Sequence, residues 1–276
     1  MQAQELHFKG AGDLGLFARL WKPVSSARAL VIITHGHGEH SGRYSHVGRA
    51  LAERGIAAAA LDWRGHGLSE GPRGFVRKWD EYREDVACLF AELDPEFESK
   101  PYFLYGHSVG GTVSLDYVMH YPGQIKGVIL SAPSLGKPNI PAILFTISKI
   151  LSIIYPSFSM ATQLDQTSLS RDPEVIKAYQ EDPLVHNIGT ARLGTELLKT
   201  TEWIQEHAHD LQIPFLLVHG AQDRLISPAD SKRFFENAGS KDKTYFDLPE
   251  GFHEPHNDLD KDVVIMRIGD WILEHS

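Results

Sequence analysis

The stretch Tyr102-Phe103-Leu104-Tyr105-Gly106-His107-Ser108-Val109-Gly110-Gly111 carries the strongest local signal in the chain. Its first four residues form an apolar run typical of a buried strand, and a helical pattern over 109–120 follows. The G-x-S-x-G pattern between strand and helix predicts a tight turn, a nucleophile elbow, that lifts the hydroxyl of Ser108 into the open. The glycines are needed because a Cβ there would collide with the crossing backbone. The amide of Val109 would start the helix and could stabilise a developing oxyanion.

Strand and helix patterns alternate on both sides of this turn. Apolar runs that suit buried parallel strands lie at 30–34, 56–61, 102–105, 128–131, 215–219 and 244–248. Helical patterns lie at 44–54, 79–93, 109–120, 228–237 and 263–274. This alternation predicts an α/β fold with a mostly parallel central sheet flanked by helices. Two further strands, near 5–8 and 16–21, are expected to form an antiparallel edge.

The alternation stops between the fourth and fifth apolar runs. From 137 to about 200 the chain holds several prolines and shows helical rather than strand periodicity. We therefore expect a helical cap, or lid, inserted over 136–200, on a core made of 1–135 and 201–276. Within 140–155, Thr146, Lys149 and Ser152 form a narrow polar stripe beside a wide apolar surface. That surface either packs on the core or stays exposed for transient membrane contact, and periodicity leaves both readings open.

Composition excludes several classes of protein. The chain has 36 acidic and 27 basic residues, a formal charge of -9, and no basic stripe, which argues against a nucleic-acid partner. The single cysteine, Cys88, lies in an apolar-periodic stretch and is expected to be an inert thiol. The polar N-terminus lacks a secretory pattern, and 140–155 is shorter than the roughly 20 residues that span a bilayer. We expect a cytoplasmic protein that is peripheral to membranes if the cap is exposed. The oligomeric state is not predicted.

A serine hydroxyl needs a histidine base and a carboxylate that orients the base. In this fold these groups follow the serine in the order acid, then histidine. Asp223 lies in the loop after the run 215–219, and His253 lies between the last strand and the last helix. We therefore predict Ser108, Asp223 and His253 as a catalytic triad. Asp230 is the fallback acid, inside a helix, and His256 is the alternative base.

A second G-x-S-x-G pattern occurs at Gly67-Leu68-Ser69-Glu70-Gly71. It lies several residues beyond its strand, and Gly71-Pro72 follows where a helix would have to begin. Ser69 is therefore expected to be structural.

The segment His35-Gly36-His37-Gly38-Glu39-His40 admits two incompatible interpretations. As a glycine-rich loop after a strand, it would supply a second oxyanion amide, that of His37. As a metal site, its H-x-H-x-E-H spacing imitates the zinc-ligand run of metallohydrolases. The metal interpretation gives no role to the elbow, the acid loop or the final histidine, so we favour the loop and expect no metal or other cofactor.

These motifs together resemble a known family. The runs 35–44, 62–71, 106–111 and 223–224 are similar to those of the monoacylglycerol lipase and lysophospholipase family of α/β-hydrolases, which are serine aminopeptidase S33-like hydrolases. The resemblance covers nearly the whole chain and is weakest in the cap. It implies hydrolysis of one acyl ester of a long lipid without a cofactor. It also implies that Glu39 and Arg43 lie near the polar head of the substrate. His37 departs from the family, where a small or apolar residue often stands.

The resulting prediction is a serine hydrolase that cleaves monoacylglycerols to fatty acid and glycerol through an acyl-enzyme. A lysophospholipase or a general carboxylesterase is the alternative within the same chemistry. Outside it stand a metallohydrolase and a hydrolase-fold protein that binds without catalysis.

Overall fold

A central sheet organises the computed structural model, which describes residues 2–136, 142–162 and 164–276. Its strand order is β1-β2-β4-β3-β5-β6-β9-β10. The strands are β1 Gln4–Lys9, β2 Gly15–Trp21, β3 Ala29–Thr34, β4 Ile56–Asp62, β5 Tyr102–His107, β6 Gly127–Ser131, β9 Phe215–Gly220 and β10 Lys243–Leu248. β1 and β2 pair antiparallel at one edge, and the strands from β4 to β10 pair in parallel. The predicted mostly parallel sheet with an antiparallel edge is confirmed.

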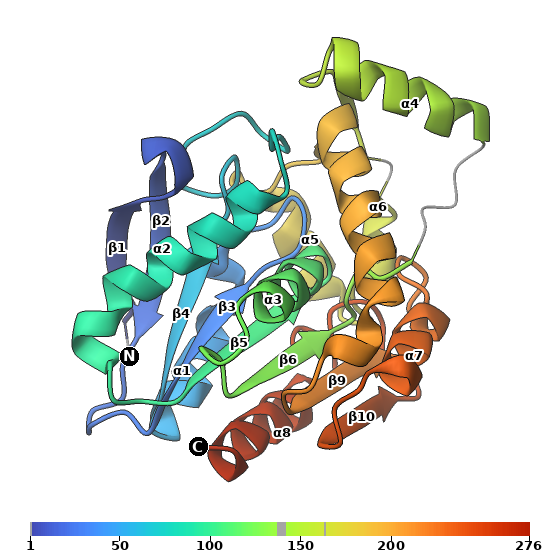
Figure 1. Cartoon of the computed structure of the whole chain (residues 1–276). Coiled ribbons are helices and arrows are strands. Elements are labelled where there is room, and N and C mark those ends of the chain that lie inside the picture. The colour runs from blue at the N-terminus through green and yellow to red at the C-terminus, as the bar shows by residue number, and fades with distance from the viewer. Residues whose placement is uncertain (1, 137–141, 163) are drawn as a thin grey trace.

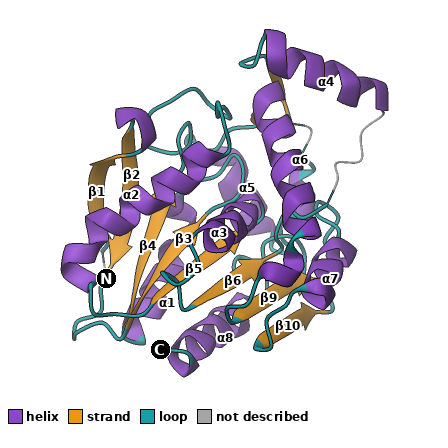
Figure 2. Cartoon of the chain, viewed as in Figure 1, coloured by secondary structure: helices purple, strands orange, loops and turns teal. Residues whose placement is uncertain are grey.

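Helices cover both faces of this sheet, as Figures 1 and 2 show. They are α1 Ser45–Glu53, α2 Asp80–Phe97, α3 Val109–His120, α7 Pro228–Asn237 and α8 Lys261–Glu274. Buried side chains of α2, α3 and α7 belong to one apolar cluster, and those of α1 and α8 belong to the other. The sheet is therefore the middle of three layers, which agrees with the predicted α/β class.

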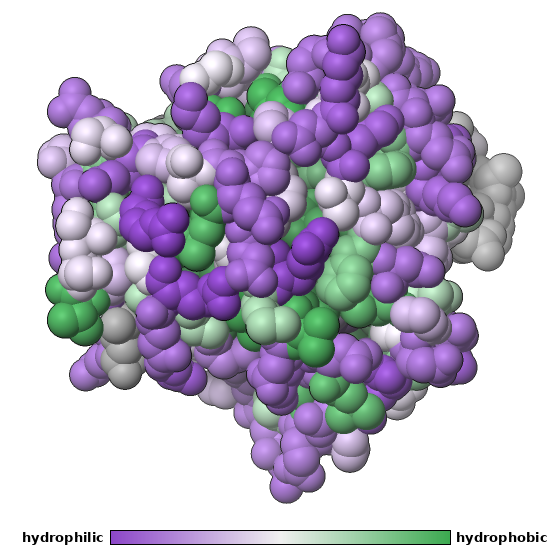
Figure 3. All heavy atoms as spheres, turned by 90° about the horizontal axis from the view of Figure 1, so that it is seen from below, coloured by the Kyte–Doolittle hydropathy of each residue, from purple (hydrophilic) through white to green (hydrophobic). Residues whose placement is uncertain are grey.

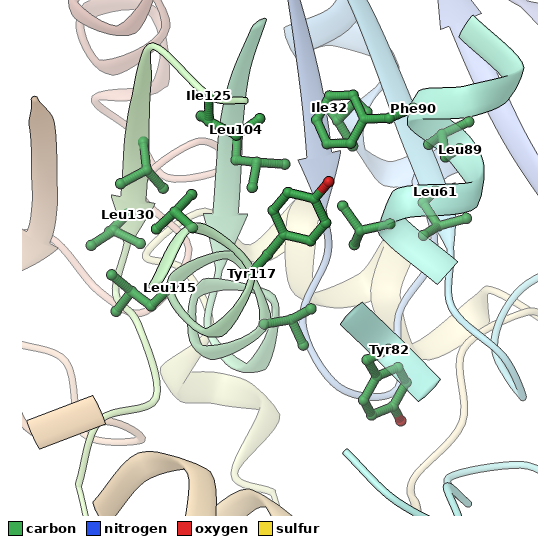
Figure 4. Close-up of a cluster of buried hydrophobic side chains, with 14 of the residues drawn as sticks. Ile32, Leu61, Tyr82, Leu89, Phe90, Leu104, Leu115, Tyr117, Ile125 and Leu130 are labelled. Atoms are coloured by element: carbon green, nitrogen blue, oxygen red, sulfur yellow. The ribbon is translucent and has the colours of Figure 1, made fainter. Parts of the chain in front are cut away.

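The central strands are buried on both faces, which explains why their sequences are continuous apolar runs rather than alternating ones. Leu104 of β5 and Leu130 of β6 point toward Leu115 and Tyr117 of α3 in Figure 4. The next residue of β5, Tyr105, belongs to the cluster on the opposite face. Alternate side chains of one strand thus fix helices on both sides, which makes the carboxyl ends of the strands a rigid platform.

Helices and a short ladder fill the segment between β6 and β9. The elements are α4 Ala142–Ile154, β7 Ser159–Ala161, α5 Pro173–Glu181, β8 Ile188–Thr190 and α6 Ala191–Glu206. β7 pairs antiparallel with β8, a ladder that the sequence did not indicate because each strand is only three residues long. In Figure 1, α4 lies at the top beside the end of α6. Residues 137–141, which include Ile140 at the start of the expected apolar stretch, lie outside the described residues.

One face of the molecule is seen in Figure 3. The face in Figure 3 is mainly hydrophilic, and its apolar side chains form separate small patches. Within the described ranges, no helix combines the length and apolar character needed to cross a membrane.

Candidate active site

The predicted elbow joins β5 to α3 through a strained residue. Ser108 lies between them with φ 52° and ψ -120°, in the left-handed region that side chains other than glycine rarely adopt. A Cβ at Gly110 would lie 2.0 Å from the carbonyl oxygen of Thr34, and one at Gly106 would lie 2.5 Å from that of Gly110. Only glycine therefore allows the first turn of α3 to cross the strand ends and hold Ser108 in this conformation.

The structure brings Ser108, His253 and Asp223 into one line of hydrogen bonds. The Oγ atom of Ser108 lies 3.1 Å from Nε2 of His253, and Nδ1 of His253 lies 2.7 Å from Oδ2 of Asp223. The acid follows β9 and the base follows β10, so adjacent parallel strands deliver both to the same edge of the sheet. The Oδ1 atom of Asp223 accepts the amides of Leu225 and Ile226 at 2.8 and 3.0 Å, which fixes the carboxylate. This is the geometry of a nucleophile, a base and an orienting acid.

The electrostatics of the pair favour charge on both partners. Burial alone would raise the pKa of Asp223, but the neighbouring His253 charge and the imidazole hydrogen bonds outweigh it and hold that pKa well below its usual range. Burial alone would lower the pKa of His253, but Asp223 outweighs it and raises that pKa above the ordinary value of 6.5. An imidazolium formed by taking the Ser108 proton is therefore stabilised.

The loop after β3 lies directly beside the serine. A Cβ at Gly36 would lie 3.3 Å from Cβ of Ser108, and the Gly36 amide donates to Oε1 of Glu39 at 2.7 Å. Val109 is the first residue of α3, so its amide has no partner one turn earlier in the helix. The amides expected to hold an oxyanion, those of His37 and Val109, thus belong to two segments that adjoin Ser108.

Glu39 and Arg43 are committed to protein partners. Arg43 donates to Oε2 of Glu39 at 2.7 Å and binds both carboxylate oxygens of Glu254 at 2.7 Å. The hydroxyl of Tyr44 donates to Oε1 of Glu39 at 2.9 Å, and the guanidinium lies over the ring of Tyr179 in α5. These side chains tie the loop after β3 to the residue that follows the base. Their expected contact with a substrate head stays a prediction.

The ring nitrogens of two candidate metal ligands have protein partners. His35 donates through Nδ1 to its neighbouring carbonyl at 2.7 Å and accepts the Trp63 amide at 3.2 Å. His40 donates through Nε2 to Asp182 at 2.8 Å and accepts the Gly42 amide at 3.1 Å. Within residues 2–136, 142–162 and 164–276, no three or more His, Cys, Asp or Glu side chains are placed together to hold a metal.

The ring of His37 packs edge-on against two other imidazoles, those of His66 and His186. Burial, with the charge of His186, lowers the pKa of His37 to about 4, so its ring is neutral near pH 7. This residue therefore places an uncharged aromatic ring in the loop after β3.

The alternatives that the sequence left open have other partners in the structure. Ser69 donates to the carbonyl of Asp62 at 2.6 Å and accepts the Phe17 amide at 2.9 Å, which is a structural position. Asp230 pairs with Arg233 of its own helix at 2.8 Å. The buried ring of His256 stacks on Tyr44 with centroids 4.6 Å apart.

Sequence reasoning missed a second histidine on the acid. The Nε2 atom of His219 lies 3.1 Å from Oδ2 of Asp223, and its Nδ1 atom lies 2.9 Å from Oγ of Ser231. The available signal was a histidine at the end of an apolar strand, four residues before the acid. A further imidazole, that of His107 in the elbow, packs on the ring of His253 at 4.8 Å.

The chain is similar in sequence and in structure to known lipases. A family model described as serine aminopeptidase, S33, matches residues 25–260. The monoacylglycerol lipase of Mycolicibacterium smegmatis is 33% identical over 98% of this chain and 97% of its own length. The monoglyceride lipase of Homo sapiens is 31% identical over 98% of this chain and 90% of its own. The crystal structure of Paleococcus ferrophilus monoacylglycerol lipase superposes with a TM-score of 0.85 at 32% identity and covers all of both chains.

Proposed function

Because the chain belongs to the serine aminopeptidase S33 family of α/β-hydrolases, together with monoacylglycerol lipases, we propose that it hydrolyses monoacylglycerols to fatty acid and glycerol. The observation that carries the proposal is the hydrogen-bonded line from Ser108 through His253 to Asp223, built on a strained elbow. It supports a serine ester hydrolase in which these residues are the catalytic triad. The reaction needs no cofactor.

The first half of the reaction forms an acyl-enzyme. The Oγ atom of Ser108 attacks the ester carbonyl while Nε2 of His253 takes the hydroxyl proton. The carbonyl oxygen becomes an oxyanion, to which the amides of His37 and Val109 would donate. The bond to glycerol then breaks, and the imidazolium returns its proton to the departing alkoxide. The fatty acyl group remains on Ser108.

The second half releases the acid. Water gives a proton to His253 and attacks the acyl carbonyl, and the same amides hold the second oxyanion. Collapse of this intermediate expels Oγ of Ser108, which recovers its proton from His253. The carboxylate of Asp223 stays ionised throughout and orients the imidazole.

We also propose that 136–200 forms a cap whose exposed helix α4 contacts a lipid surface. This helix exposes apolar side chains where an ordinary surface helix presents polar ones. Ser152 is buried and lies 2.7 Å from the hydroxyl of Thr195 in α6, whereas Ile153 and Ile154 are 77% and 72% exposed. Exposed apolar side chains that cluster on one helix are typical of interfacial binding. A long acyl ester resides in such an interface, which supports a lipid substrate.

The proposed reaction is tested by intact mass after treatment with a fluorophosphonate and by fatty-acid release. We expect one covalent adduct on the wild-type chain and none on Ser108→Ala, with monoacylglycerol hydrolysis lost in the same variant. Faster release from lysophosphatidylcholine than from monoacylglycerol would contradict the substrate and favour the lysophospholipase alternative. Hydrolysis that persists in Ser108→Ala and is stopped by a chelator would contradict the serine mechanism.

The lipid contact is tested by replacing Ile153 and Ile154 together with glutamate. We expect weaker co-sedimentation with phosphatidylcholine vesicles and slower turnover of vesicle-borne monoacylglycerol, because burying two carboxylates in the interface is unfavourable. Turnover of a short water-soluble ester should be unchanged. The exposed Val24, in the loop after β2, provides the matched control variant Val24→Glu. Equal vesicle binding by all three chains would contradict the contact.

A further inference from the structure

One carboxylate oxygen of Asp223 accepts hydrogen bonds from two imidazoles. The Oδ2 atom of Asp223 lies 2.7 Å from Nδ1 of His253 and 3.1 Å from Nε2 of His219. His219 is the penultimate residue of β9 and is completely buried. Ser231, which contacts its other nitrogen, is completely buried in α7. The imidazole of His219 is therefore closed to solvent. Among Ser108, His253 and Asp223, its hydrogen bond is to Asp223.

The direction of each hydrogen bond follows from the chemistry of the groups. An ionised carboxylate only accepts, so Nε2 of His219 carries a proton that it donates to Asp223. In the neutral ring, Nδ1 is then an acceptor, and the hydroxyl of Ser231 donates to it at 2.9 Å. The bonds form one series that runs from Ser231 through His219 to Asp223.

We propose that His219, with its tautomer fixed by Ser231, is a positioning residue that sets how strongly Asp223 attracts the proton of His253. The inference rests on the proposed role of Ser108, His253 and Asp223 and concerns only their tuning. Each donor that shares Oδ2 stabilises the ionised carboxylate and leaves less of its charge for the other donor. The amides on Oδ1 prevent the carboxylate from rotating to separate the two imidazoles. His219 thus lowers the proton affinity of His253 from the value that Asp223 alone would impose.

Titratable and charged groups other than Asp223 also surround His253. They are His107 at the end of β5, Glu39 and Arg43 after β3, and Glu254 and His256 on its own loop. Among the described residues around His253, Asp223 is the group that hydrogen-bonds to His219. A change in the ionisation of His253 on replacing His219 must therefore pass through Asp223.

The test is the pH dependence of the second-order rate at which a fluorophosphonate labels Ser108, since this rate reports on neutral His253 without depending on the natural substrate. For His219→Leu we expect the acid limb of the profile to move upward by roughly half a pH unit or more, because the carboxylate loses a competing donor. His219→Gln should keep the wild-type profile, since an amide nitrogen at that position can still donate to Asp223.

Two serine variants keep the test informative if His219→Leu fails to fold. Ser231→Ala removes the donor that fixes the tautomer and should shift the acid limb in the same direction by a smaller amount. Ser240→Ala removes a buried hydroxyl that bonds Asp242, outside the series, and should leave the profile unchanged. A loss of rate that is equal at every pH, with no movement of the acid limb, would overturn the proposal and leave His219 a packing residue. A wild-type chain that is not labelled at Ser108 would instead overturn the proposed function.

Discussion

Gly110 lies where the first turn of α3 crosses the end of β3. A Cβ there would meet the carbonyl oxygens of Thr34 and His35 at 2.0 and 2.5 Å, and these backbone atoms cannot rotate away. We expect Gly110→Ala to destabilise the fold by about 3 kcal/mol or more in urea unfolding, because strand and helix must separate. The control is Gly194→Ala in α6, where a Cβ meets nothing within 4 Å, and its stability should stay equal or rise. Equal effects of the two substitutions would contradict the crowding argument.

The ionisation of His253 predicts how kcat/KM decreases on the acid side of its pH profile. The base must be neutral to accept the Ser108 proton, and its pKa is raised above 6.5, so kcat/KM should fall as pH decreases through a value above 6.5. In Asp223→Asn the raising effect is lost, so the acid limb should move to lower pH and kcat should fall by roughly four orders of magnitude.

The fallback acid supplies the control for this prediction. Asp230→Asn removes a carboxylate that pairs with Arg233 on the same helix, and it should keep the wild-type profile. If Asp230→Asn had the large effect and Asp223→Asn the small one, the orienting acid would be Asp230 and not Asp223.

Chain order and local context predicted the positions that the structure joins at Ser108, His253 and Asp223, because each follows a strand that the apolar pattern marks. The same reasoning could not find the His219 and Ser231 contacts. They depend on the direction of a side chain at the end of β9 and on how α7 packs there, and neither leaves a periodic pattern. The sequence also could not predict that Arg43 lies between two carboxylates, because one of them, Glu254, is distant from Arg43 in the sequence.

At the scale of elements, the 3-10 helix Ser41–Tyr44 is joined to the loop after β10 by Arg43. Arg43→Met would leave Glu39 and Glu254, which are 3% and 2% exposed, as buried carboxylates without their cation. We expect a loss of roughly 3–5 kcal/mol in the free energy of unfolding at neutral pH. Urea unfolding measures it.

The control for this ion pair is Arg233→Met, which breaks a helix-surface pair with a 55% exposed side chain and should cost less than about 1 kcal/mol. The Arg43 variant should also lose less stability than the wild type on acidification. Burial alone would raise the pKa of Glu254, and Arg43 is the chief influence that opposes burial and holds this pKa at about 2. Without Arg43 the carboxyl protonates at higher pH. Similar losses for both arginines would contradict the coupling of the two loops.

Element boundaries were predicted best where the apolar patterns are sharp. α3 and α7 have the expected limits, and each predicted strand is present within a residue or two. α2 continues beyond the expected end at 93 to Phe97, with Pro95 in its last turn. In α4 the sequence showed the polar stripe but not which member is buried: Thr146 and Lys149 are exposed, whereas Ser152 is buried. Tertiary packing on α6 decides that Ser152 faces inward.

At the scale of the whole molecule, the sheet buries imidazoles that must stay neutral. Burial is the largest cause that lowers the pKa of His35, His66, His107 and His256, and the value for His107 falls to about 3. These side chains are at most 2% exposed. An unfolded chain would bind protons on all of them near the ordinary value of 6.5, whereas the folded chain would not.

The sign of the stability change follows from this difference in bound protons. Stability from a histidine with a lowered pKa is complete above about pH 6.5 and is lost as pH falls toward its folded pKa. His253, whose pKa is raised, contributes stability that is complete below about pH 6.5 and is lost as pH rises through its folded pKa, so it does not offset the other histidines in the acid range. We expect the free energy of unfolding to decrease from about pH 6.5 to about pH 5 by roughly 1.4 kcal/mol per pH unit for each net proton. Urea unfolding across this range measures the slope.

In His66→Gln, where an amide can still donate to the Arg64 carbonyl that His66 contacts at 3.1 Å, the slope should flatten by about one proton. A flat profile in the wild type, or the same slope in this variant, would mean that the interior admits charged imidazoles.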